Sequence, residues 1–80
     1  MDKEIETRMM EFMRPLFGDM AHQTIENQKE KLGIADGELT YEQYLTIAES
    51  IKDLCNKMAG SSVADRIYSG LIGILEAEKA

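Results

Sequence analysis

Two side chains of this sequence could act as a nucleophile or carry a proton, and they are its single histidine, His22, and its single cysteine, Cys55. An imidazole exchanges protons near neutral pH, and a thiolate attacks electrophiles or binds metals. Cys55 has no second cysteine to form a redox pair, and no histidine lies near it in sequence to activate it. It falls on a predicted apolar helix face, so we expect a core side chain whose thiol pKa is raised rather than lowered.

His22 has acidic neighbours at helical spacing, Asp19 three residues before it and Glu26 four residues after it. It is predicted to lie on the polar side of a helix and to contact solvent. Phosphotransfer domains are also small, acidic and helical, with one reactive histidine, but they typically carry a lysine and a glycine just after it, where residues 23–26 here read Gln-Thr-Ile-Glu. We therefore expect no enzyme, and the alternative is a small helical enzyme or phosphotransfer protein that uses His22.

Residues 36–44, Asp-Gly-Glu-Leu-Thr-Tyr-Glu-Gln-Tyr, resemble the second half of an EF-hand calcium loop and the start of its following helix. In this alignment Asp36 takes the fifth loop position, and Gln43 takes the twelfth, where a bidentate glutamate normally binds calcium. The first and third positions would be Leu32 and Ile34, which are hydrocarbon. Calcium needs six to eight oxygen ligands, so the sequence predicts no calcium binding, and we expect no other metal or cofactor.

A long helix is predicted over residues 2–32, because its apolar side chains recur at spacings of three and four. Pro15 lacks an amide hydrogen and Gly18 follows within one turn, so this helix should kink or break near Arg14. A kink is favoured, since the apolar arc keeps its phase across the proline. Gly33 is placed to end the helix in a left-handed conformation.

A capping box marks the start of a second helix, predicted over residues 41–59. The hydroxyl of Thr40 and the amide of Gln43 can each bond the other residue's backbone N–H, and Gly60 ends the helix. Seven residues share its apolar face: Tyr44, Ile47, Ala48, Ile51, Leu54, Cys55 and Met58.

A third helix is predicted over residues 62–77, with a cap from the pair Ser61-Ser62 and fraying after Glu76. Gly70 and Gly73 each cost roughly 1 kcal/mol of helix propensity relative to alanine, so another backbone is expected to approach closely there. The predicted fold is all-α: one domain over residues 1–80, with a long kinked N-terminal helix and then a helical hairpin.

The charge balance weighs against several classes of partner. Nine Lys and Arg stand against fifteen Asp and Glu, a net charge of −6, and no segment is basic. This balance disfavours nucleic acid and anionic membrane surfaces. Apolar stretches fall far short of the roughly 20 residues that cross a bilayer. With no secretory leader pattern and one cysteine, a cytoplasmic protein is expected.

Each predicted helix has an apolar arc of about 160° to 180°, wider than the roughly 100° that a small bundle covers. A second copy of the chain would cover the excess, which predicts an intertwined helical homodimer; a monomeric four-helix bundle broken at Pro15 is the alternative. The expected function is a small non-catalytic interaction and assembly module that self-associates and binds another protein. The residues predicted to form the interface are Met9, Met10, Met13, Leu16, Phe17 and Met20.

Overall fold

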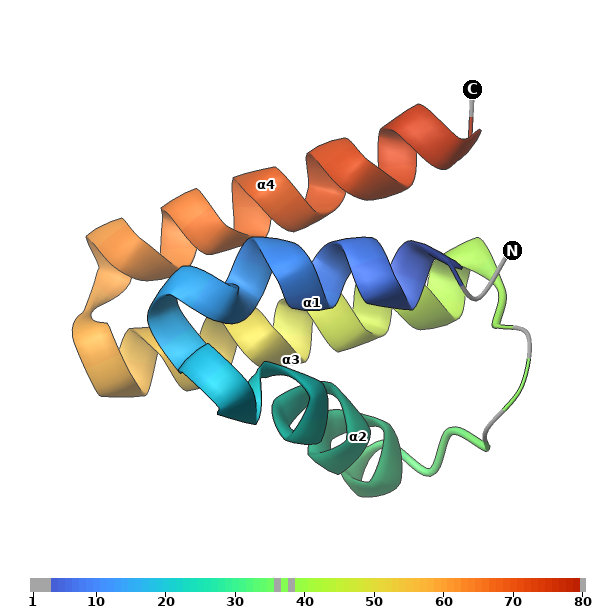
Figure 1. The fold of residues 1–80 in the computed structure, drawn as a ribbon, viewed down its shortest axis with the longest axis horizontal. Coiled ribbons are helices and arrows are strands. Elements are labelled where there is room, and N and C mark those ends of the chain that lie inside the picture. Colours follow the sequence, from blue (N-terminus) through green and yellow to red (C-terminus); the bar gives the residue numbers. More distant parts are fainter. Residues whose placement is uncertain (1–3, 36, 38, 80) are drawn as a thin grey trace.

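The computed structural model describes residues 4–35, 37 and 39–79. The described residues form helices joined by short connections and contain no strand, which confirms the all-α prediction of a long kinked N-terminal helix followed by a helical hairpin. Asp36 and Glu38, which belong to the calcium-loop resemblance, lie outside the described residues. The elements, drawn in Figure 1, are α1 (Glu4–Phe17), the 3-10 turn η1 (Gly18–Met20), α2 (Ala21–Lys31), α3 (Tyr41–Ala59) and α4 (Ser61–Lys79).

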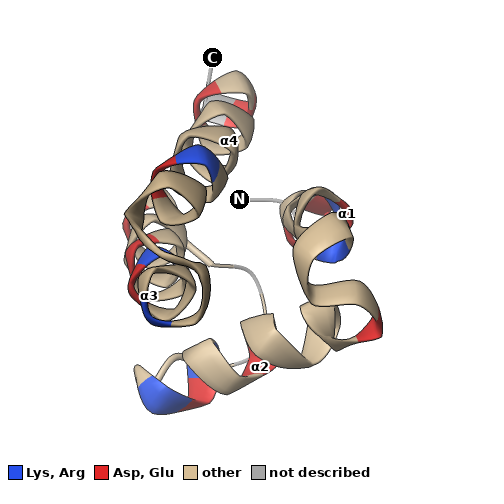
Figure 2. Cartoon of the chain, turned by 90° about the vertical axis from the view of Figure 1, so that its left-hand side faces the viewer, with Lys and Arg blue, Asp and Glu red and all other residues tan. Residues whose placement is uncertain are grey.

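The N-terminal helix bends later than the sequence predicted. α1 continues through Pro15 to Phe17, and the chain turns at η1, where Gly18 adopts a φ of +60°. The prediction of a kink near Arg14 was therefore wrong by about one turn: Pro15 lies inside α1, and the left-handed glycine redirects the chain. A straight helix over residues 4–31 would be about 42 Å long, whereas the longest extent of the molecule is 30 Å. After the bend, α2 runs across the molecule below α3 (Figure 2).

α2 ends in a Schellman motif. The N–H of Ile34 donates to the carbonyl of Lys29 at 2.8 Å, and the N–H of Gly33 donates to the carbonyl of Glu30 at 3.1 Å. Gly33 has a φ of +70°, so the predicted left-handed end of this helix is confirmed. These bonds satisfy carbonyls that the last helical turn would otherwise leave unpaired.

α3 begins and ends where the sequence predicted. The N–H of Gln43 donates to Thr40 Oγ1 at 3.2 Å, and the N–H of Thr40 donates to Gln43 Oε1 at 2.9 Å, so both halves of the capping box are formed. Gly60 follows the helix with a φ of +92°. The local signals at both ends were therefore sufficient to define this helix.

α4 differs from its prediction at both ends. It starts at Ser61, directly after Gly60, so the serines lie within its first turn, and it extends to Lys79 instead of fraying after Glu76. The expectation that another backbone approaches Gly70 and Gly73 was wrong at both positions. The neighbour of Gly70 is the side chain of Phe12 on α1, and an added Cβ at Gly73 would meet nothing within 4 Å.

The core lies where α1 and α2 pack against the α3–α4 hairpin. The inner face of α3 supplies its centre, and five of the seven residues predicted for that face are fully buried: Tyr44, Ile47, Ala48, Ile51 and Cys55. Leu54 is half-buried. Met58, in the last turn of α3, is exposed over 58% of its surface, so the predicted apolar face extends one turn beyond the part that the chain itself covers.

Candidate functional site

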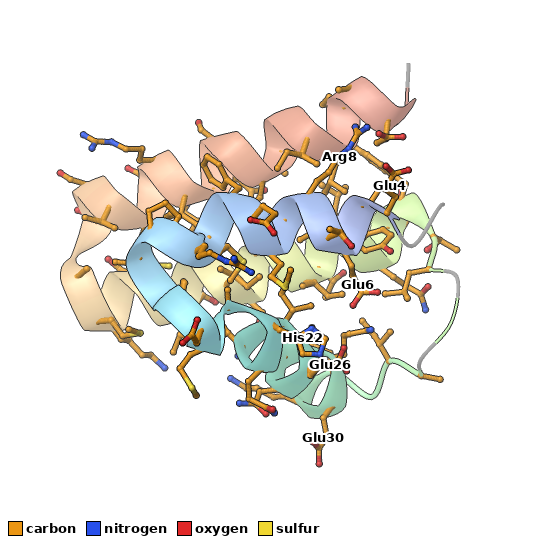
Figure 3. All side chains as sticks on the ribbon, in the orientation of Figure 1. Glu4, Glu6, Arg8, His22, Glu26 and Glu30 are labelled. Atoms are coloured by element: carbon orange, nitrogen blue, oxygen red, sulfur yellow. The ribbon has the colours of Figure 1, made fainter. Side chains whose placement is uncertain are left out.

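A cleft of about 520 Å³ separates α1 from α2 and is lined by the chain's single histidine, two glutamates and a lysine. We call it the α1–α2 cleft. Figure 3 shows Glu6 on α1 and His22 and Glu26 on α2 in the space between the two helices. The bend at η1 creates this arrangement, because it folds α2 back beside the first half of the same long helix. Its lining residues are Glu6, Thr7, Met10, His22, Ile25, Glu26 and Lys29.

A nearly buried lysine joins the two walls of the cleft. Only 4% of the Lys29 side chain is exposed, and its Nζ lies 2.8 Å from Glu6 Oε1 on α1 and 3.5 Å from Glu26 Oε1 on α2. Burying an ammonium is costly unless it is paired, so these two carboxylates are what allow Lys29 to be buried. The burial of Lys29 was not predicted from the sequence. The pairing of Lys29 with Glu26 has helical spacing, but Glu6 lies 23 positions away, and no local pattern connects the two.

His22 lies on the exposed side of α2, as predicted, and lines the cleft. The cleft also holds Lys29, a cation of the kind that a phosphotransfer site needs. Lys29 is, however, already paired with two carboxylates, and these three groups together carry one net negative charge. Such a charge repels an incoming phosphoryl group, so the electrostatics of the cleft disfavour phosphoryl transfer at His22.

Cys55 is fully buried in the core, as the sequence predicted. Burial raises the pKa of the Cys55 thiol, because the low-dielectric interior disfavours the charged thiolate. Cys55 therefore belongs to the packing of α3 rather than to a reactive site.

Metal and membrane features can be assessed over the part of the chain that the structure describes. Within residues 4–35, 37 and 39–79, no three or more His, Cys, Asp or Glu side chains are grouped so that they could hold a metal ion. Within the same residues, no helix is long and apolar enough to span a bilayer.

The six residues predicted to form an interface divide into three groups. Met9 and Met13 are fully buried in the chain's own core, so they are not on its surface in this conformation. The reason is the bend, which lets α1 pack against the hairpin of its own chain. Met10 and Phe17 are half-buried against that core. Leu16 and Met20 remain exposed, over 36% and 59% of their surfaces.

Phe12 is also exposed over 36% of its surface, although it was not among the residues predicted to form the interface. Its spacing of four residues from Leu16 was a signal that could have found it. Phe12 and Leu16 lie one helical turn apart on α1, and Met20 follows in η1, beyond the left-handed Gly18; we call these three exposed side chains the apolar ridge. Phe12 and Leu16 are neighbours on one helix face, and contiguous exposed apolar side chains are typical of surfaces that bind other proteins.

Searches against protein-family models, curated proteins and solved structures find no match to this chain. The function is therefore inferred from the residues of this chain and their arrangement.

Proposed function

We propose that this protein is a non-catalytic helical assembly module that associates with a second copy of itself through the apolar ridge. The observation that carries the proposal is the exposure of three large apolar side chains, Phe12, Leu16 and Met20, within nine residues of the chain, whereas the other exposed large apolar residues, Leu32 and Met58, lie singly at helix ends. Burial of apolar surface is the main favourable contribution to most protein–protein association. A surface of this kind is self-complementary when a two-fold axis passes through it, because each side chain then meets its own counterpart or a neighbour.

A non-catalytic role is supported by the chemistry of the α1–α2 cleft. Its lysine is held by two carboxylates, and His22 shares the cleft with both of them. The buried thiol of Cys55 is likewise held in its uncharged form. Neither the paired Lys29 nor the buried Cys55 thiol is an activated nucleophile.

The test compares two leucines of nearly equal exposure. Leu16 on the ridge is 36% exposed, and Leu32 at the end of α2 is 37% exposed. Sedimentation equilibrium from micromolar to submillimolar concentration should give a dimer for the parent protein and for Leu32→Glu, and a monomer for Leu16→Glu. Circular dichroism should show that both variants keep their helices.

Two results would contradict the proposal. One is a parent protein that remains monomeric over the whole concentration range. The other is equal weakening of the dimer by Leu16→Glu and Leu32→Glu, because added charge alone, rather than the ridge, would then explain the loss.

A further inference from the structure

We propose that the α1–α2 cleft binds a small organic cation, an amine with an apolar body. Its ammonium group is held by Glu6 and Glu26. Its apolar body lies against Met10 and Ile25. None of the residues that line the cleft belongs to the apolar ridge, so this inference goes beyond self-association and does not depend on it. Three features of the cleft support it, namely its size, its apolar base and its charge.

The cleft has the size of a small-molecule site. Its volume of about 520 Å³ lies within the range of about 300 to 1,000 Å³ that is typical of such sites, which often form between the helices of a bundle. Its two walls come from α1 and α2, which pack against each other on either side of the turn at η1. A ligand in the cleft would therefore contact both helices at once.

The base of the cleft is apolar. Ile25 is only 2% exposed and Met10 is half-buried against the core, so these two lining residues lie deeper than the exposed His22. The thioether of Met10 is flexible and polarisable, so it can adapt to the shape of a ligand. A hydrocarbon or aromatic group placed here would remove apolar surface from water, which favours binding.

The charge of the cleft selects the class of ligand. Glu6 and Glu26 share one cation, Lys29, so these three groups carry one net negative charge (Figure 3). A neighbouring hollow of about 320 Å³ shares Glu26 and Lys29 with the cleft and adds a further carboxylate, Glu30. The side chains of Glu6 and Glu26 are 16% and 32% exposed, and such partial burial strengthens their attraction to a cation compared with bulk water. An organic cation therefore matches the cleft, whereas an anion is repelled.

The two carboxylates can accept a second ammonium group. A carboxylate offers about four lone-pair positions, and Glu6 and Glu26 each contact Lys29 through Oε1. Lys29 already shows that carboxylates from both helices converge on one ammonium nitrogen. A metal ion fits less well, because no three His, Cys, Asp or Glu side chains of residues 4–35, 37 and 39–79 are grouped to hold one.

The first test uses phenethylammonium, which joins an ammonium group to an aromatic ring. It is titrated into the ¹⁵N-labelled parent protein at constant ionic strength, and the backbone amides are followed by NMR. Shift changes should be concentrated at the residues that line the cleft, with a dissociation constant of about 1 mM for so small a ligand. Phenethyl alcohol lacks the charge and methylammonium lacks the ring, so each should bind at least about tenfold more weakly.

The second test separates the cleft from the general charge of the chain. Glu26→Gln removes one negative charge from the cleft, and Glu49→Gln removes one from an exposed position on α3 that does not line it. Lys29 keeps its closer partner, Glu6 at 2.8 Å, in the first variant, so we expect its fold to be retained, which circular dichroism checks. Glu26→Gln should raise the dissociation constant for phenethylammonium about tenfold, and Glu49→Gln should change it by less than about twofold.

Four results would overturn the proposal: no shift changes at about ten times the expected dissociation constant, shift changes spread over exposed acidic residues instead of the cleft, equally tight binding of phenethyl alcohol, and equal weakening by the two variants. The proposed function is tested separately. A parent protein that stays monomeric but binds phenethylammonium in the cleft would contradict self-association and leave this inference standing.

Discussion

The ring of Phe12 on α1 occupies the space that a side chain at Gly70 on α4 would need: a β-carbon built on Gly70 would lie 1.9 Å from Phe12 Cζ. This contact fixes how closely the two helices approach. We expect Gly70→Ala to lower the free energy of unfolding by about 1 kcal/mol, because displacing the ring costs about 1 to 3 kcal/mol and exceeds the gain in helix propensity of about 1 kcal/mol.

Gly73 on the same helix is the matched control, since an added Cβ meets nothing there. Gly73→Ala should raise stability by about 1 kcal/mol in urea unfolding. If both substitutions stabilise the protein, the ring of Phe12 moves aside at no cost, and the contact does not set the spacing of α1 and α4.

The ion pair between Lys29 and Glu6 should contribute more to the free energy of unfolding than the surface ion pair between Lys52 and Asp65. Lys29→Met leaves Glu6 and Glu26, which are partly buried, without their shared cation, and should cost about 2 to 3 kcal/mol, less than for a fully buried pair. Lys52 lies 3.7 Å from Asp65, with its side chain 41% exposed. Lys52→Met should therefore change the free energy of unfolding by less than about 1 kcal/mol. Equal costs in urea titrations would show that burial does not strengthen the Lys29 pair.

The capping box of α3 predicts a difference between two threonines. Thr40→Ala should lower stability by about 1 kcal/mol, because it removes the side-chain bond to the N–H of Gln43. Thr46 lies inside the same helix, where its hydroxyl donates to the carbonyl of Glu42. Thr46→Ala should leave stability unchanged or slightly increased, because alanine is the better helix former. Chemical denaturation of the two variants is a direct comparison, and a smaller loss for Thr40→Ala than for Thr46→Ala would contradict the role of the cap.

The buried thiol of Cys55 predicts how stability changes at high pH. Burial raises its pKa in the folded state above the ordinary value of 9.0, so between the two pKa values the unfolded chain binds fewer protons. The contribution of the protonated Cys55 thiol to the free energy of unfolding is therefore fully present below about pH 9, and it is lost as the pH rises further. Urea unfolding at about pH 8 and about pH 10 should show a smaller decrease for Cys55→Ala than for the parent, since tyrosine ionisation remains in both. Equal decreases in the parent and in Cys55→Ala would mean that the thiol does not contribute to the pH dependence of stability.

Helix ends and buried faces that depend on residues close together in the sequence could be predicted from the sequence alone. Thr40 and Gln43 are three residues apart, and their mutual hydrogen bonds define the start of α3. Gly33 ends α2 because a left-handed residue is what the Schellman bonds require. The burial of Cys55 followed from its position on a regular apolar face. In each case the determining interaction spans one helical turn or follows from helical periodicity, so no knowledge of the remaining chain was needed.

The features that the tertiary structure decided involve residues far apart in sequence. Pro15 and Gly18 both indicated a bend, but only the packing of α2 beneath α3 showed that the chain turns at Gly18. The burial of Lys29 depends on Glu6, 23 positions away, and the need for glycine at position 70 depends on Phe12. Helical periodicity determines which side chains share a face, but not which part of that face another helix will cover. For this reason Met9 and Met13, predicted for an interface between chains, lie in the core of a single chain, while Leu16 and Met20 remain at its surface.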